Sequence, residues 1–128
     1  MYCLDSSFIV DYSRRDVGAR AKMTELHEAG SKLAVPSVAL AEILVGANYK
    51  GGATLVRTLR FLEFLDVLPF DTETAAEAGR LGAEALRRGK PIVGADLLIA
   101  GTARYHRATL LSRDNIFPGI PGLAVESY

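Results

Sequence analysis

The chain has 128 residues, 49% of them hydrophobic, and its fifteen Lys and Arg balance fifteen Asp and Glu, giving a formal net charge of zero. This composition predicts one globular domain over residues 1–128 and argues against a protein that holds nucleic acid through bulk positive charge. The longest apolar run, residues 35–47, is shorter than the roughly 20 residues of a membrane-spanning helix. Cys3 is the only cysteine, which excludes an internal disulfide, and the acid at position 5 argues against a signal peptide and for a cytoplasmic protein.

The first half of the chain alternates short apolar strands with helices. In chain order, the predicted elements are a strand over residues 2–4, helices over 6–12 and 17–29, a strand over 32–35, and helices over 38–49 and 53–65. Asp5 or Ser6 is expected to cap the first of these helices, and Ser37 the third. Pro36 is expected to break the second strand, and Gly30 to end the second helix.

The second half continues the alternation. Its predicted elements are a strand over residues 67–69, a helix from Asp71 or Thr72 to about Arg88, a helix over 95–106, and strands over 108–111 and 123–126. Strands that alternate with helices predict an α/β domain with a mainly parallel, five-stranded sheet and helices on both faces. Ligands of such sheets bind beyond the carboxyl ends of the strands, where Asp5 and Asp114 are both expected.

Two further acids interrupt apolar helices. Glu42 is the only charged residue in residues 38–47, and Asp96 begins an apolar helical face that continues with Ile99 and Ala100. Burying a carboxylate costs several kcal/mol unless it is paired, hydrogen-bonded or bound to metal. Both acids are therefore functional candidates, although Asp96 could also serve only the helix dipole.

The four acids together indicate a site for a divalent cation. Asp5, Glu42, Asp96 and Asp114 would repel one another in one pocket unless a divalent cation neutralised them. A site made only of oxygen ligands suits Mg²⁺ or Mn²⁺. Gathering four acids also leaves a net positive remainder, and two readings of it stay open. Each of these cations belongs either to a basic surround of the pocket or to a scattered, solvated surface: Arg14, Arg15, Lys50, Arg57, Arg60, Arg87, Arg88, Lys90, Arg104, Arg107 and Arg113.

Four segments of the chain resemble, in order, the acidic motifs of PIN-domain nucleases. They are Met1-Tyr2-Cys3-Leu4-Asp5-Ser6-Ser7, Pro36-Ser37-Val38-Ala39-Leu40-Ala41-Glu42, Ala95-Asp96-Leu97-Leu98-Ile99-Ala100 and Leu110-Leu111-Ser112-Arg113-Asp114. The length and the Ile120-Pro121-Gly122-Leu123 ending are similar to VapC toxins of toxin–antitoxin pairs. The last motif departs from the family's Thr-x-Asn/Asp-x-x-Asp-Phe pattern because it is one residue shorter and lacks the second acid.

The resemblance implies a PIN-like fold and an Mg²⁺-dependent endoribonuclease, with Mn²⁺ as a substitute metal. Asp5, Glu42 and Asp96 would form the catalytic, metal-binding core, completed by Asp114 and supported by Ser6 or Ser112. The implied partners are an RNA substrate, a VapB-type antitoxin and a second copy in a homodimer. An antitoxin tail is expected to lie along the apolar surfaces of residues 8–12 and 38–47 and to place an Arg in the acidic pocket.

Two other functions remain open. An Asp-based Mg²⁺ phosphatase would use Asp5 as its nucleophile and would need a further acid beside it, which Ser6 and Ser7 do not supply. A catalytically silent domain that binds only RNA or protein predicts that one of the four acids is missing, yet all four positions are filled.

Overall fold

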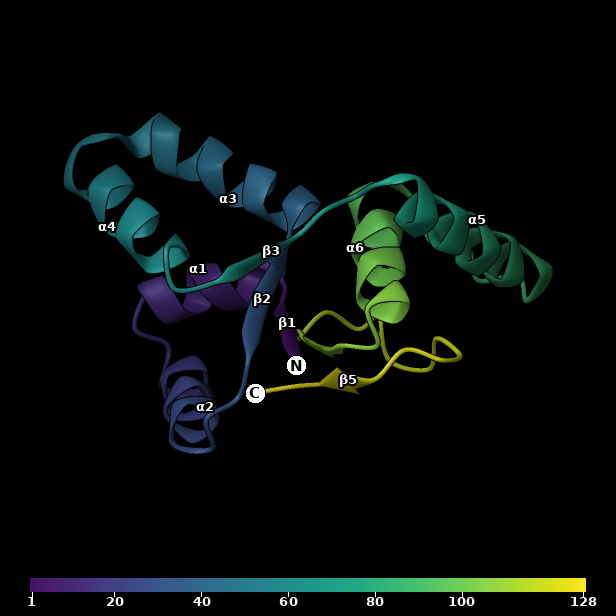
Figure 1. The fold of residues 1–128 in the computed structure, drawn as a ribbon, viewed down its shortest axis with the longest axis horizontal. Coiled ribbons are helices and arrows are strands. Elements are labelled where there is room, and N and C mark those ends of the chain that lie inside the picture. The colour runs from purple at the N-terminus through teal and green to yellow at the C-terminus, as the bar shows by residue number, and fades with distance from the viewer.

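The computed structural model describes residues 1–128 and contains a five-stranded, wholly parallel sheet. Its strands are β1 (Tyr2–Leu4), β2 (Leu33–Pro36), β3 (Asp66–Leu68), β4 (Thr109–Leu111) and β5 (Val125–Glu126). Their spatial order is β3-β2-β1-β4-β5. The N-terminal strand β1 therefore lies at the centre of the sheet, between β2 and β4 (Figure 1).

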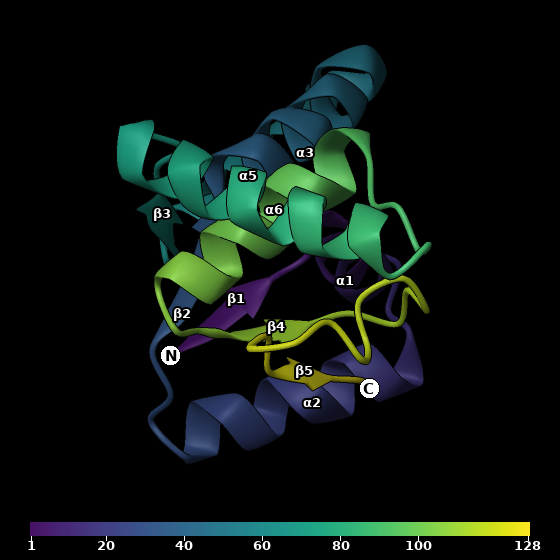
Figure 2. The same cartoon turned by 90° about the vertical axis from the view of Figure 1, so that its right-hand side faces the viewer.

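Six helices surround this sheet. They are α1 (Ser6–Ser13), α2 (Val17–Glu28), α3 (Ser37–Lys50), α4 (Gly52–Leu62), α5 (Thr72–Arg87) and α6 (Gly94–Tyr105). Figure 2 shows α2 along one face of the sheet, with α6 along the other and α5 outside α6. The α/β class, the five parallel strands and the cover on both faces predicted from the sequence are thereby confirmed.

The core lies between the sheet and its helices. Leu4, Val35 and Leu110, from the three central strands, are fully buried, as are Phe8 of α1 and Ile99 of α6. Strands buried on both faces need apolar residues at successive positions, which explains the short unbroken apolar runs of the sequence. Cys3 belongs to this core, and burial raises the pKa of its thiol to about 12.

The helix starts follow the predicted caps at two places and depart from them at a third. Asp5 caps α1 by accepting the backbone N–H of Ser6 at 2.8 Å, and Asp71 caps α5. The prediction that Ser37 caps α3 is wrong, because β2 continues through Pro36 directly into the helix. The Ser37 hydroxyl instead accepts the backbone N–H of Phe70 at 3.1 Å and so ties α3 to the segment after β3.

No helix of the fold combines the length and the apolar character that crossing a bilayer requires.

Candidate active site

The parallel strands bring the first and last acidic segments together. Asp5 follows β1 and Ser112 follows β4, and these two strands are neighbours with Leu4 opposite Leu111. The backbone N–H of Asp5 donates to the carbonyl oxygen of Leu111 at 3.2 Å. Strand register thus places residues more than a hundred positions apart at one edge of the sheet, as expected for a parallel sheet with its site at the carboxyl ends.

Asp5 is the most firmly held of the four acids. It is 5% exposed, and its Oδ2 accepts the hydroxyls of Ser112 at 2.8 Å and Ser7 at 2.9 Å, while Oδ1 accepts the N–H of Ser6. Three donors to one buried carboxylate fix its orientation. Sequence reasoning named Ser112 but missed Ser7, which the Asp-Ser-Ser run could have revealed because hydroxyls near an Asp cap often bond its carboxylate.

Glu42 reaches the same edge from the middle of α3. The hydroxyl of Ser6 donates to its Oε1 at 3.3 Å, which links Glu42 to the cap of α1. The expectation that Glu42 is buried is wrong, since the side of α3 that carries it is exposed. Even so, partial loss of hydration, followed by the negative charges of Asp5 and Asp96, raises its pKa, while the Ser6 hydroxyl acts in the opposite direction.

Asp96 and Asp114 complete the group. Asp96 lies half-buried in the first turn of α6, and its pKa is raised first by loss of hydration and then by the charges of Asp114 and Asp5. Asp114 is exposed on the loop after β4. Its backbone N–H donates to the Ser112 hydroxyl at 3.0 Å, and its Oδ1 accepts the N–H of Ile116 at 3.1 Å.

The four acids from four elements therefore act on one another electrostatically at one edge of the sheet. No group of three Asp, Glu, His or Cys side chains is closed enough in this structure to hold a metal ion by itself. The arrangement still fits Mg²⁺, because this ion keeps several of its waters and is usually held by only one or two carboxylates. All the donors are oxygens, which fits Mg²⁺ or Mn²⁺ better than zinc.

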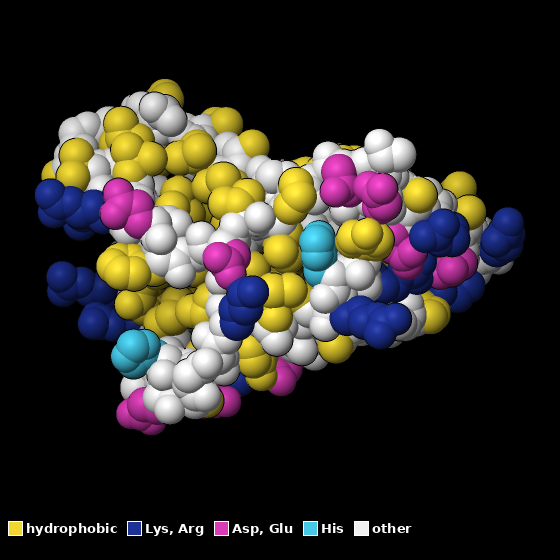
Figure 3. Space-filling model, in the orientation of Figure 1, with side chains coloured by type: hydrophobic (Ala, Val, Ile, Leu, Met, Phe, Trp, Pro, Cys, Tyr) yellow, Lys and Arg dark blue, Asp and Glu magenta, His cyan; other side chains and the backbone are white.

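The basic residues divide into those that bind acids and those that do not. Five of the fifteen form ion pairs, namely Lys22, Lys32, Arg80, Arg104 and Arg113. The reading of Arg104 and Arg113 as part of a free basic surround is therefore wrong. The other cations gather largely at two ends of the molecule, and Figure 3 shows dark blue side chains around the hollow at its left and over the far end of α5 at its right.

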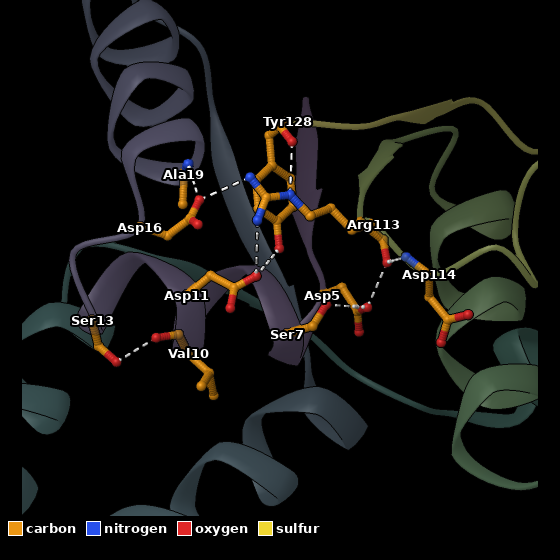
Figure 4. A network of polar contacts seen from close by, with 11 residues as sticks. Asp5, Ser7, Val10, Asp11, Ser13, Asp16, Ala19, Arg113, Asp114 and Tyr128 are labelled. Atoms are coloured by element: carbon orange, nitrogen blue, oxygen red, sulfur yellow. Dashed lines mark hydrogen bonds and ion pairs between the residues drawn. The ribbon is translucent and has the colours of Figure 1, made fainter.

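Arg113 anchors the loop that carries Ser112 and Asp114. Its side chain points away from Asp5 and Asp114, toward α1 and α2 (Figure 4). There Nη2 donates to Asp16 at 2.8 Å, Nε donates to the backbone oxygen of Tyr128 at 2.7 Å, and the guanidinium lies 4.1 Å from the Tyr128 ring centre. Since Arg113 stands between Ser112 and Asp114, these contacts tie the loop that carries both residues to the body of the fold.

Comparison with known proteins identifies the family of this fold. The PIN domain family matches residues 2–123. The tRNA(fMet)-specific endonuclease VapC of Salmonella typhimurium is 31% identical over 77% of this chain and 76% of its own length. Ribonuclease VapC2 of Rickettsia felis is 29% identical over 100% of this chain and 98% of its own.

A solved structure, VapBC2 from Rickettsia felis bound to a DNA fragment from its promoter, superposes with a TM-score of 0.85 at 26% identity. It covers 99% of this chain and 98% of that one. The family match, the sequence relatives and the fold all point to the same group, so this chain belongs to the PIN domain family, among its VapC members.

Proposed function

We propose that this protein is an Mg²⁺-dependent endoribonuclease, the toxin of a toxin–antitoxin pair. The observation that carries the proposal is the convergence of Asp5, Glu42, Asp96 and Asp114 at the carboxyl edge of the sheet. Loss of hydration, and after it the like charges of neighbouring acids, raises the pKa of Glu42 and of Asp96, so the site favours a bound cation. The similarity to proteins named as endonuclease and ribonuclease supports RNA as the substrate class.

We assign the roles of the site residues according to how firmly the structure holds each side chain. Asp5, fixed by Ser7 and Ser112, would serve as the rigid ligand of the metal. Glu42 and Asp96 would complete the ligand set and orient the attacking water. Bound Mg²⁺ would supply the positive charge that activates this water and stabilises the phosphate and the leaving oxygen.

Asp114 has a more limited role in this scheme. One of its carboxylate oxygens accepts the N–H of Ile116, and the other makes no hydrogen bond within the protein. We therefore place Asp114 as a ligand through water, and we expect its substitution to cost less activity than substitution of Asp5. This position also fits the shortened last motif, which lacks the family's second acid.

Inhibition by a small antitoxin is the second part of the proposal. A hollow of about 400 Å³ lies beside α1, α3 and α4, with Ile9, Tyr12, Ile43 and Phe61 among its lining residues. It covers part of the surface expected from residues 8–12, although Phe8 itself is core. Cations also line it, namely Arg14, Arg15, Arg20, Lys50 and Arg57, so an inhibitory tail that docks there should be amphipathic and acidic.

Cleavage of total RNA by the purified protein tests the enzymatic part. We expect cleavage with millimolar Mg²⁺ or Mn²⁺, none with EDTA, and nearly complete loss in Asp5→Asn, Glu42→Gln and Asp96→Asn. Double substitutions among the three should lose little more, because groups that act as a unit are not additive. Asp66→Asn, which alters an exposed acid paired with Lys32, is the matched control and should cut normally. Metal-independent cutting, or a fully active Asp5→Asn, would overturn the proposal.

A growth assay tests the toxin part. Expression of the chain alone should slow growth, and co-expression with the neighbouring small open reading frame should restore growth and yield a co-purifying complex. A silent RNA- or protein-binding domain would be harmless in this assay, and Asp5→Asn would behave like the wild type. A phosphatase would instead release phosphate from small esters and leave RNA intact.

A further inference from the structure

A second hollow is lined by the chain segments that adjoin Asp96 and Asp114. It has a volume of about 390 Å³ and lies between the α5–α6 connection and the loop after β4, two segments that run close together at the right of Figure 2. Six of its lining residues carry the argument: Arg88, Lys90, Ile92, Asn115, Ile116 and Ile120.

Both walls of this hollow lead directly into the site. On one wall, Asn115 follows Asp114, and the N–H of Ile116 donates to Asp114 Oδ1. On the other, the connection containing Ile92 enters α6, whose first turn holds Asp96. Because the charge of Asp114 acts on Asp96, the two walls meet at these acids. A strand that leaves the scissile phosphate on this side would pass through the hollow next.

The rim of the hollow carries two cations that form no ion pair. Arg88 and Lys90 are exposed, and the one carboxylate that Arg88 influences is Glu84, whose pKa its charge helps to lower. Their backbone is fixed by the end of α5, where the N–H of Lys90 donates to the carbonyl of Ala85 at 3.0 Å and Gly89 takes a φ of 70°. Fixed backbone and free charged ends suit these residues to phosphate groups.

The floor and one wall supply complementary chemistry. Ile116 is half-buried and offers the main apolar surface to the face of a base, whereas Ile92 and Ile120, each 6% exposed, add only a small apolar area. The side chain of Asn115 is exposed and its amide makes no hydrogen bond within the protein. An amide without an internal partner can both donate and accept hydrogen bonds, so it can bind the edge of an unpaired base.

The other large group of unpaired cations is separated from the acids along the helices α1 and α3. Lys50 stands eight positions beyond Glu42 on α3, which is about 12 Å along the helix axis. Arg14 follows the end of α1, nine positions beyond Asp5, at a similar distance. Those cations line the hollow at α1, α3 and α4, whereas Arg88 and Lys90 border the segment that continues from Asp114.

The geometry points to a nucleotide subsite in this second hollow. It takes the single-stranded RNA next to the scissile bond: Arg88 and Lys90 bind its phosphate, the isoleucines, Ile116 above all, support a base, and Asn115 contacts the edge of that base. This assignment rests on the proposed function and adds to it the place where the substrate is held and a residue that selects its sequence.

Binding of a short fluorescein-labelled single-stranded RNA to Asp5→Asn protein, followed by anisotropy, tests the subsite without cleavage. The added pair Arg88→Gln and Lys90→Gln should weaken binding about tenfold and flatten the dependence of log K on log salt by about 0.7 for each phosphate that the protein no longer neutralises. Lys50→Gln with Arg57→Gln removes the same charge from the other hollow and is the matched control. Equal affinity and equal salt dependence for the two pairs would overturn the assignment.

Cleavage by the otherwise wild-type protein adds two readouts. The Arg88 and Lys90 variants should raise KM with little change in kcat, and Asn115→Ala should change which bases flank the cut without changing the salt dependence. An unchanged KM and cut site would count against the subsite. If the wild type cuts no RNA while the Arg88–Lys90 pair still loses binding, the nuclease proposal fails and the subsite stands.

Discussion

The buried hydroxyl of Ser112 offers the sharpest test of how the acidic site is held. Ser112 is 2% exposed, donates to Asp5 Oδ2 at 2.8 Å and accepts the N–H of Asp114 at 3.0 Å. Ser112→Ala removes both hydrogen bonds and leaves a 5%-exposed carboxylate with one donor fewer. A hydrogen bond to a charged group contributes about 1.5–3 kcal/mol, and removal of the acceptor adds to this, so we expect a cost of about 3 kcal/mol.

Thermal unfolding would measure this cost. Since a chain of 128 residues loses about 4 °C per kcal/mol, the melting temperature should fall by about 12 °C. Ser13→Ala is the control, because the exposed hydroxyl of Ser13 donates only to the carbonyl of Val10, and its cost should stay below about 0.5 kcal/mol. Ser7→Ala, which removes the more exposed of the two hydroxyls on Asp5, should lie between them. If Ser112→Ala melts within about 2 °C of the wild type, Asp5 is held by something other than this bond.

Three further outcomes follow from the site and the packing. Because the fold raises the pKa of Glu42 and Asp96, the native state binds more protons than the unfolded state. The free energy of unfolding of the metal-free protein should therefore fall as the pH rises from about 4 through these raised pKa values. Mn²⁺ should therefore raise the melting temperature more at pH 7 than at pH 4, and a shift that ignores pH would contradict the shared pocket. A Cβ added at Gly101 of α6 would lie 2.6 Å from the Cβ of Ala78 on α5, so Gly101→Ala should lower the free energy of unfolding in urea by about 1–3 kcal/mol. A Cβ added at Gly79 would meet nothing within 4 Å, so Gly79→Ala is the control and should be neutral or stabilising. Light scattering should give twice the mass of the chain if the expected homodimer forms, and a single mass would refute it.

Sequence periodicity predicted the elements well because each strand here is a short apolar run between clear helix signals. The chain order of all eleven elements agrees with the expectation, and differences are limited to element ends, such as β5, which is reduced to Val125–Glu126. Local caps were correct where the side chain acts on its own helix, as with Asp5 and Asp71. Ser37 failed because its partner, Phe70, is 33 residues away, and no local pattern contains that contact.

The sequence predicted which acids are candidates for the site, but it did not predict how exposed they are or which residues surround them. The apolar neighbours of Glu42 suggested burial, yet Val45 is 72% exposed and Tyr49 is 91% exposed on the same helix. An apolar helix predicts a buried face only if the chain itself covers that face, and this chain leaves part of α3 open. Similarly, Arg113 looked like a free cation because Asp16 and Tyr128, which bind it, are distant in sequence.

The central place of β1 determines when this protein can become active during its own synthesis. Tyr2 pairs with Leu33 on one side and with Thr109 on the other. The strand β1, which Asp5 follows, can therefore pair with β4 only after most of the chain has been made. A ribosome adding 5–20 residues per second needs roughly 4–14 s to pass from Glu42 to Asp114. For most of that interval the nascent chain lacks both Asp96 and Asp114, and nearly to its end it lacks the Ser112 hydroxyl that fixes Asp5. The proposed nuclease activity should therefore arise late in synthesis, after β4 has paired with β1.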